Sequence, residues 1–387
     1  MSIDQIDVPR DLLTPQGIVF RCTVAQFVHL RPAMDAYLSG YGLRPSDVMA
    51  HMNVPSHTLS LTMAEPDRAG DTLGLIDDVA HALTEELVEL PSRAGTKTQV
   101  LTVSKKEIVF AMLQSGRASY FQGAACDVQA LIDHVGVRQN IVAWSEVLAW
   151  KWPDGGPANF NGKYWKRGLH LAGYSLHAAV NDIFVNQQRY SMGCYTASKL
   201  VMVQGILDYY HRVKHSPDML RDIETKLMQG GSPLSSIEPG VMWSFEPDST
   251  PEDRERPGKL LTIQFGIPGR NFIPGDWSYF LNTDALTHEK TGYEGSNTIY
   301  LGRGRFSDFY NDHNHYYTYK EKLHEVYQWR NRVFNDRRDA AKIQPLTAGD
   351  YVKLGTTPEQ GGIQLDLRVV PQLFGYREAP LLLSGDR

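Results

Sequence analysis

A polar stretch turns abruptly into a long apolar one between residues 186 and 213, and Cys194 stands at the junction. After Tyr195 the apolar residues recur at helical spacing, so we predict a helix over 195–213 that packs one face into the core. A residue at the start of a helix lies beside unpaired backbone N–H groups and the positive end of the helix dipole. We therefore expect this position to lower the pKa of Cys194 and to favour the reactive thiolate. A buried cysteine that only fills space is the alternative interpretation.

The composition excludes several classes of protein. The 387 residues are 42% hydrophobic, which is enough for a large core and for more than one domain. The formal charge of −5 gives no support for a nucleic-acid partner. We find no apolar run of the roughly 18 residues that a membrane span needs. The polar residues 1–17 do not form a Sec signal peptide, so we expect a cytoplasmic protein or one exported without such a signal.

Only three cysteines occur, at positions 22, 126 and 194. They are far apart and odd in number, so we expect neither a disulfide framework nor a zinc ribbon. The sequence gives no indication of the oligomeric state.

The N-terminal part mixes short strand patterns with amphipathic helices. Alternation of apolar residues predicts strands over 17–24 and 96–104, whereas helical spacing predicts helices over 72–90 and 127–150. Residues 151–162 are rich in Pro, Gly and Asn, so we place the main domain boundary there.

The second half of the chain predicts strands more than helices. Strand patterns occupy 259–267, 276–282 and 296–302, and an amphipathic helix is predicted over 319–342. We interpret its Lys- and Arg-rich part, 320–338, as a solvent-exposed face. The fold class is α+β. The expected division is an N-terminal α/β region of unknown role (1–150), a catalytic domain (151–335) and a C-terminal segment packed on that domain (336–387).

A cysteine nucleophile needs a base and a polar group that orients the base. The candidates in the strand-rich stretch after residue 290 are Glu294, Asp308, Asp312, His313 and His315. Strand-forming residues follow His315, whereas the turn-former Asn314 follows His313. We therefore expect His315 to begin a strand and face Cys194, with His313 at the rim of the cleft.

The same four His and Asp side chains suggest one alternative, a metal site, because imidazole and carboxylate suit zinc or manganese. No further ligand set is evident in the sequence. We assign neither a metal nor a cofactor.

Several ordered blocks match one family. Around the nucleophile the matching residues are Asp182, Ile183, Asn186, Tyr190, Cys194, Thr196 and Ala197. The other blocks are Asn161 with Tyr164 and Trp165, Gly275-Asp276 with Tyr279-Phe280, and Gly295, Asn297, Ile299, Leu301 and Gly302. In these blocks the segment 161–330 resembles the small bacterial transglutaminases, the protein-glutamine γ-glutamyltransferases of spore coats. The resemblance implies a compact papain-like (NlpC-type) core with Cys194 as nucleophile.

The chain departs from the family at positions that would carry its acids and its histidine: Gly193, Ser296 and Phe309. Glu294, two residues before Ser296, shares its face of a strand and is the expected substitute for the missing acid. Asp308 is the alternative orienting acid. His313 or His315 replaces the histidine only if the loop after Phe309 is longer than in the family.

The resemblance implies that Cys194 attacks the carboxamide of a glutamine, releases ammonia and passes the acyl group to a lysine amine or to water. The expected partners are proteins with glutamine and lysine side chains. One alternative is a papain-like amidase or peptidase, and another is a degenerate papain fold that only binds. Added N-terminal residues on a cross-linking core without a Sec signal suggest, by analogy, a delivered bacterial effector or toxin.

Overall fold

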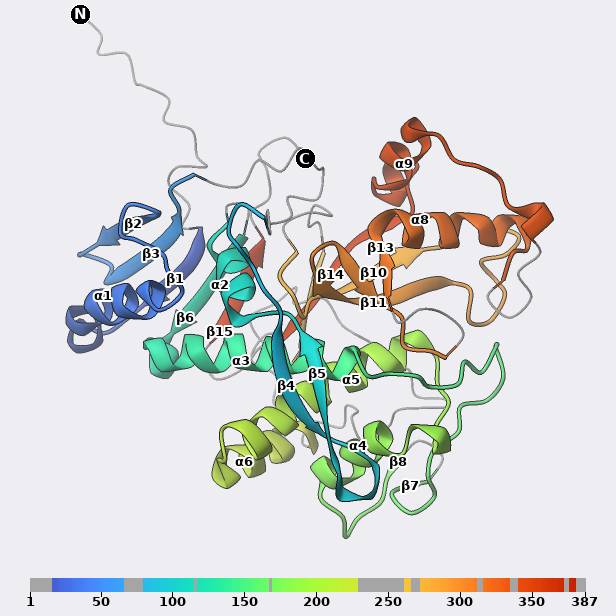
Figure 1. Cartoon of the computed structure of the whole chain (residues 1–387), viewed down its shortest axis with the longest axis horizontal. Coiled ribbons are helices and arrows are strands. Elements are labelled where there is room, and N and C mark those ends of the chain that lie inside the picture. The colour runs from blue at the N-terminus through green and yellow to red at the C-terminus, as the bar shows by residue number, and fades with distance from the viewer. Residues whose placement is uncertain are drawn as a thin grey trace, which may run out of the picture.

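The computed structural model combines helices with two main sheets. Figure 1 shows a five-stranded sheet on one side of the molecule and a six-stranded sheet on the other, with helix α3 (Val128–Ser145) running from the first sheet toward α5 (Cys194–Asp208). No helix in the described part of the chain is both long and apolar enough to cross a bilayer. The structure describes residues 16–65, 79–114, 117–166, 169–228, 261–265, 272–311, 316–334, 340–371 and 376–380.

The five-stranded sheet has the order β15-β6-β1-β3-β2. Its strands are β1 (Gly17–Arg21), β2 (Val48–Asn53), β3 (Thr58–Met63), β6 (Arg117–Gln122) and β15 (Tyr376–Pro380). The predicted strand at 17–24 is confirmed as β1, which pairs in parallel with β6 and antiparallel with β3. Near the C-terminus β15 returns to pair antiparallel with β6. Helix α1 (Val24–Ser39) contacts β3 of this sheet. Helix α2 (Lys105–Leu113) contacts β1, β3 and β6.

The prediction of a helix over 72–90 is wrong where the structure describes it. Residues 79–85 form turns and loop, and 86–90 lie in a hairpin made of β4 (Glu86–Pro91) and β5 (Lys97–Thr102), the second of which confirms the predicted strand at 96–104. Cross-strand pairing of Leu87 with Leu101 and burial of Leu90 stabilise the extended form. Part of the predicted helix, 66–78, lies outside the described residues.

Helices α3 and α5 pack at close range and confirm two predicted helices. A Cβ at Gly205 of α5 would lie 2.8 Å from the Ile141 Cα of α3, so only glycine allows this approach. Polar side chains fix the same contact, because Asn140 and Trp144 of α3 both donate to the Asp208 carboxylate, at 3.0 and 2.9 Å. After Asp208 the helix continues as a π-helical turn, Tyr209–Val213, so the predicted end at residue 213 is also confirmed.

Smaller elements precede and follow α5 in the chain. Helix α4 (Leu176–Val185) packs on α5, and α6 (Pro217–Met228) follows the π-helical turn. A two-stranded sheet pairs β7 (Trp165–Lys166) with β8 (Leu169–His170).

The six-stranded sheet is antiparallel throughout, in the order β13-β12-β11-β10-β14-β9. Its strands are β9 (Leu261–Phe265), β10 (Trp277–Leu281), β11 (Gly295–Gly302), β12 (Arg305–Ser307), β13 (Tyr316–Thr318) and β14 (Gln364–Pro371). The predicted strands at 259–267, 276–282 and 296–302 are therefore confirmed. Helices α8 (Tyr319–Gln328) and α9 (Ala348–Leu354) pack beside it, and α8 contacts β10, β12 and β13.

Helix α8 corrects the interpretation of 320–338 as a solvent-exposed face. The helix ends at Gln328 and a 3₁₀ turn follows, which closes at Arg332 in the left-handed conformation. Two of its charged side chains, Lys322 and Glu325, are buried against the sheet. Periodicity alone did not reveal this, because a charged pair that neutralises itself can occupy a buried face.

The two N-terminal cysteines form a disulfide, although their separation in the sequence led us to expect no disulfide framework. Cys22 follows β1 and Cys126 follows the turn after β6, and their Cα atoms are 5.4 Å apart. The parallel pairing of β1 with β6 brings these distant positions together. Cys194 is the one free cysteine of the chain.

A buried carboxylate joins the two halves of the molecule. Asp276 stands directly before β10 and accepts hydrogen bonds from Arg117 of β6 at 2.6 and 3.1 Å and from Arg138 of α3 at 2.9 Å. The Ile273 backbone N–H donates a further bond at 2.8 Å. Arg138 also donates to His134, whose pKa is lowered by burial and by the two arginine charges, so that the ring is neutral and accepts.

We predict that Asp276→Ala destabilises the protein by about 3–5 kcal/mol, because it leaves two buried guanidinium groups without a carboxylate. The measurement is urea unfolding followed by tryptophan fluorescence. The matched control is Asp35→Ala in the part-exposed Arg31–Asp35 pair of α1, for which the expected loss is below about 1 kcal/mol. Equal losses in the two variants would contradict the role assigned to Asp276.

Candidate active site

Cys194 is the first residue of α5 and lies at the junction predicted from the sequence. Gly193 is the N-cap and provides no side-chain cap to the helix. The segment before it is fixed, because the Tyr310 hydroxyl donates to the Met192 carbonyl at 3.0 Å and Ser191 exchanges backbone hydrogen bonds with Asn159. The segment that leads into the helix is therefore fixed in place, and so is the position of Cys194.

Residues of the sequence blocks around Cys194 gather at one carboxylate. Asp182, near the end of α4, accepts hydrogen bonds from Asn161 and Asn186, each at 2.7 Å, and from the Tyr190 hydroxyl. Burial raises the pKa of Tyr190, and so does its bond to Asp182, which keeps the phenol protonated as a donor. This cluster fixes α4 and the loop before Cys194 relative to each other.

The Cys194 sulfur lies against β11. The Asn297 backbone N–H and its side-chain Nδ2 donate to the sulfur at 3.5 and 3.3 Å, and the thiol points at the Gly295 carbonyl at 3.8 Å. The Trp277 indole N–H donates to Asn297 Oδ1 at 2.9 Å. Since an indole N–H can only donate, Oδ1 must face Trp277, and Nδ2 is left to face the sulfur.

Gly295 is required where β11 passes the cysteine. A Cβ at this position would overlap the hydroxyl of Tyr279, which lies on the neighbouring strand β10. Burial raises the pKa of Tyr279, and so do the charges of Cys194 and Glu294. The ring is thus a neutral wall beside the sulfur.

Burial raises the pKa of Cys194 above its ordinary value, contrary to the expectation that the helix N-terminus would lower it. The two Asn297 hydrogen bonds and the Lys322 charge act in the opposite direction, whereas the Glu294 charge raises the pKa further. Desolvation outweighs the Asn297 hydrogen bonds and the Lys322 charge, so the resting group is a thiol. Any reaction through the thiolate would require a base to take this proton.

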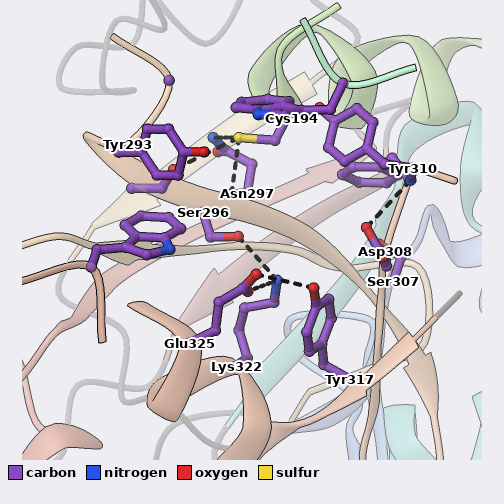
Figure 2. Close-up of a pocket in the computed structure, with 15 residues that line it drawn as sticks. Cys194, Tyr293, Ser296, Asn297, Ser307, Asp308, Tyr310, Tyr317, Lys322 and Glu325 are labelled. Atoms are coloured by element: carbon purple, nitrogen blue, oxygen red, sulfur yellow. Dashed lines mark hydrogen bonds and ion pairs between the residues drawn. The ribbon is translucent and has the colours of Figure 1, made fainter. Parts of the chain in front are cut away.

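A small pocket, partly open to solvent, lies beside the sulfur. Figure 2 shows Cys194 and Asn297 on one side of the β11 ribbon and Ser296, Lys322 and Glu325 on the other. Aromatic side chains and small polar groups form the rest of the wall. The lining residues are Trp152, Cys194, Gly292, Tyr293, Gly295, Ser296, Asn297, Ser307, Asp308, Phe309, Tyr310, Tyr317, Lys322, Glu325 and Trp329.

The two expected acids lie in different surroundings. Asp308 follows β12, is buried, lines the pocket and accepts from the Tyr310 backbone N–H at 3.3 Å. Glu294 is exposed before β11, where its carboxylate accepts from the Gly292 N–H at 2.8 Å, and it is not among the lining residues.

The expected histidines, His313 and His315, lie outside the described residues, as does Asp312. The described chain resumes at β13, one residue after His315. Of the alternative metal-binding set only Asp308 is described, so the structure does not test that site. Within the described ranges no group of three or more His, Cys, Asp and Glu residues is placed to hold a metal ion.

The contribution of α8 to the pocket was not predicted from the sequence. Lys322 and Glu325 form an ion pair of 2.7 Å, and Lys322 donates to Ser296 Oγ at 3.1 Å. Their i,i+3 spacing beside the apolar Leu323 and Val326 was a signal in the sequence, because it places one charged pair at the border of an apolar helix face.

Comparison with known proteins identifies the family. The sequence profile of the protein-glutamine gamma-glutamyltransferases matches residues 88–332, well over half of the chain. The chain belongs to this family. The match begins before the 161–330 segment recognised in the sequence, so this transglutaminase-family region includes α2, β6 and α3 as well as the strands around Cys194.

A solved structure is also similar, a transglutaminase from Geobacillus stearothermophilus without its C-terminal extension. It shares 18% sequence identity with a TM-score of 0.37, and the alignment covers 63% of this chain and 93% of that one. No curated protein matches the sequence significantly.

We predict that Asn297→Ala raises the pKa of Cys194 and slows its alkylation at neutral pH about tenfold, because the thiolate loses one side-chain donor. The measurement is the rate of reaction with iodoacetamide as a function of pH. Cys194→Ala gives the background, because Cys22 and Cys126 form a disulfide, and Asn53→Ala, on the distant strand β2, is the matched control. An unchanged rate profile would show that the Nδ2 contact does not act on the sulfur.

Proposed function

We propose that the chain is a cysteine-dependent protein-glutamine γ-glutamyltransferase with a papain-like core and that Cys194 is its nucleophile. The observation that carries the proposal is the half-buried Cys194 sulfur at the start of α5, which accepts two N–H groups of Asn297 within the family-matched region. A helix that presents its first residue to an antiparallel sheet supports the papain-like arrangement.

The first half of the reaction makes a thioester. The Cys194 thiolate attacks the carboxamide carbon of a glutamine, and the C–N bond breaks after the nitrogen gains a proton, which releases ammonia. The charge that develops on the carboxamide oxygen needs donors near the attacking sulfur. The Asn297 Nδ2 and backbone N–H, already directed at the sulfur, are the described donors at that place.

The second half releases the enzyme. A lysine amine attacks the thioester carbonyl, loses a proton and forms an isopeptide bond, and the thiol is restored. Water in place of the amine gives glutamate, which is net deamidation. The aromatic wall of the pocket, with Trp152 and Trp329, supports exclusion of water, and exclusion of water favours the amine.

The raised pKa of Cys194 requires a base, and we assign that role to His315, with His313 at the rim. The orienting acid is Asp308 ahead of Glu294. Burial of Asp308 in the pocket, four residues before the segment that holds both histidines, supports this choice. The exposure of Glu294 favours a lesser electrostatic role.

We predict that Cys194→Ala abolishes ammonia release from a glutamine donor peptide without loss of folding. The measurement combines ammonia release, incorporation of a fluorescent amine and hydrolysis of a peptide bond by the same preparations. Amine incorporation by the wild type supports transfer to an amine, whereas peptide hydrolysis alone points to the amidase alternative. Ammonia release that persists in Cys194→Ala rules out this nucleophile, and none from the wild type supports a binding protein.

We predict that His315→Ala lowers turnover at least a hundredfold with little loss of stability, because the thiol loses its base. His313→Ala keeps a measurable fraction of the activity, and each variant serves as control for the other. The measurement is kcat for ammonia release together with thermal unfolding. The reverse order of the two effects would move the assignment of the base to His313.

A further inference from the structure

A buried cation lies in the pocket of the proposed nucleophile, and the proposed function does not use it. Lys322 projects from α8 toward β11, where Ser296 accepts its hydrogen bond at 3.1 Å. Its ammonium group also pairs with Glu325 at 2.7 Å and lies 3.6 Å from the centre of the Tyr317 ring. The Tyr317 hydroxyl donates to the other oxygen of Glu325 at 3.0 Å, so both members of the ion pair are held in place.

Burial of this pair is hard to explain by stability alone. The two side chains are only 5% and 3% exposed. Moving two charged groups out of water costs about as much free energy as their attraction returns, and apolar side chains often serve as well in such places. The pair also lies beside a serine at the position where the resemblance implies a glutamate. A glutamate at position 296 would partly neutralise Lys322, whereas Ser296 accepts its hydrogen bond without a charge.

The location of Lys322 connects it to the sulfur. Ser296 lies between Gly295 and Asn297, the two residues whose groups contact Cys194. Figure 2 shows the ammonium group directed at Ser296 from the far side of β11. Of the described lining residues, Lys322 is the only lysine or arginine.

We propose that Lys322 is a positioning residue that favours the Cys194 thiolate through its buried positive charge and through its hydrogen bond to Ser296. This inference rests on the proposed role of Cys194 as nucleophile. The charge of Lys322 lowers the pKa of Cys194, which is the direction that the role requires. The paired Glu325 carboxylate opposes this attraction in part, whereas the desolvated surroundings make what remains stronger than it would be at the surface.

Other titratable groups face the same region, so a test must distinguish their effects from that of Lys322. Glu294, before β11, raises the pKa of Cys194. Tyr279 of β10 and Tyr317 of β13 flank the site, and Asp308 and Glu325 line the pocket. Removal of the cation and removal of Glu294 should therefore shift the titration of Cys194 in opposite directions.

The experiment follows alkylation of Cys194 by iodoacetamide across pH in the full chain, with Cys194→Ala as background. Lys322→Met is expected to move the midpoint up by about one pH unit, which slows the reaction about tenfold below the midpoint. Lys322→Arg keeps the charge and should restore most of the wild-type profile. Glu294→Gln should move the midpoint down, by less, because Glu294 is exposed.

Lys320→Met is the matched control, because Lys320 lies on the exposed side of the same helix. Lys322→Gln is a second neutral variant, which keeps a donor for Glu325 and protects the test if Lys322→Met fails to fold. An unchanged midpoint in the folded neutral variant overturns the proposal. So does a shift of the same sign in Glu294→Gln, since that would indicate a change in packing.

Alkylation needs no glutamine substrate, so the two proposals can fail separately. A shifted midpoint in a protein that releases no ammonia would leave the Lys322 role standing and reject the transferase. Ammonia release with an unshifted midpoint would support the transferase and reject the role of Lys322.

Discussion

The Asp276 carboxylate is the interaction on which the rest of the structure depends. It binds Arg117 from the five-stranded sheet and Arg138 from α3, and it stands directly before the strand that carries Trp277. Trp277 then sets the orientation of the Asn297 amide, and that amide donates to the sulfur at the start of α5. The charge cluster is thus linked to the candidate site by the peptide bond from Asp276 to Trp277 and by two hydrogen bonds, from Trp277 to Asn297 and from Asn297 to the sulfur. Because buried ion pairs tolerate little misalignment, the cluster also fixes the register of β10 against α3.

Two opposing effects meet at the Cys194 sulfur. Burial favours the neutral thiol, while the Asn297 donors and a lysine charge favour the thiolate. A resting thiol reacts slowly with oxidants and electrophiles, because the thiolate is the reactive form. Donors that are fixed in advance still stabilise negative charge once a base removes the proton, and they need no rearrangement at that moment. The resting sulfur is therefore a weakly reactive thiol, and the neighbouring donors would stabilise its thiolate.

Local patterns predicted part of this structure and tertiary pairing decided the rest. The helix that begins at Cys194 follows from apolar spacing over many turns, which is a strong local signal. The stretch 72–90 carried apolar residues that suit either a helix or a strand, and pairing with β5 decided for the strand in its last residues. The disulfide depends on the parallel pairing of β1 with β6, which no local pattern encodes. Lys322 and Glu325 looked like surface charges because only the sheet beneath them makes their burial possible.

The return of β15 to the five-stranded sheet has a consequence for synthesis on the ribosome. About 250 residues separate β6 from β15, although the two strands are neighbours. At about 5–20 residues per second, the outer edge of β6 stays unpaired for roughly 10–50 s after that strand is made. An unpaired strand edge is a template for pairing with another chain. During this interval the N-terminal half of the nascent protein is nearly complete, but the edge of β6 can still pair with another chain. Synthesis and pairing of β15 end the interval.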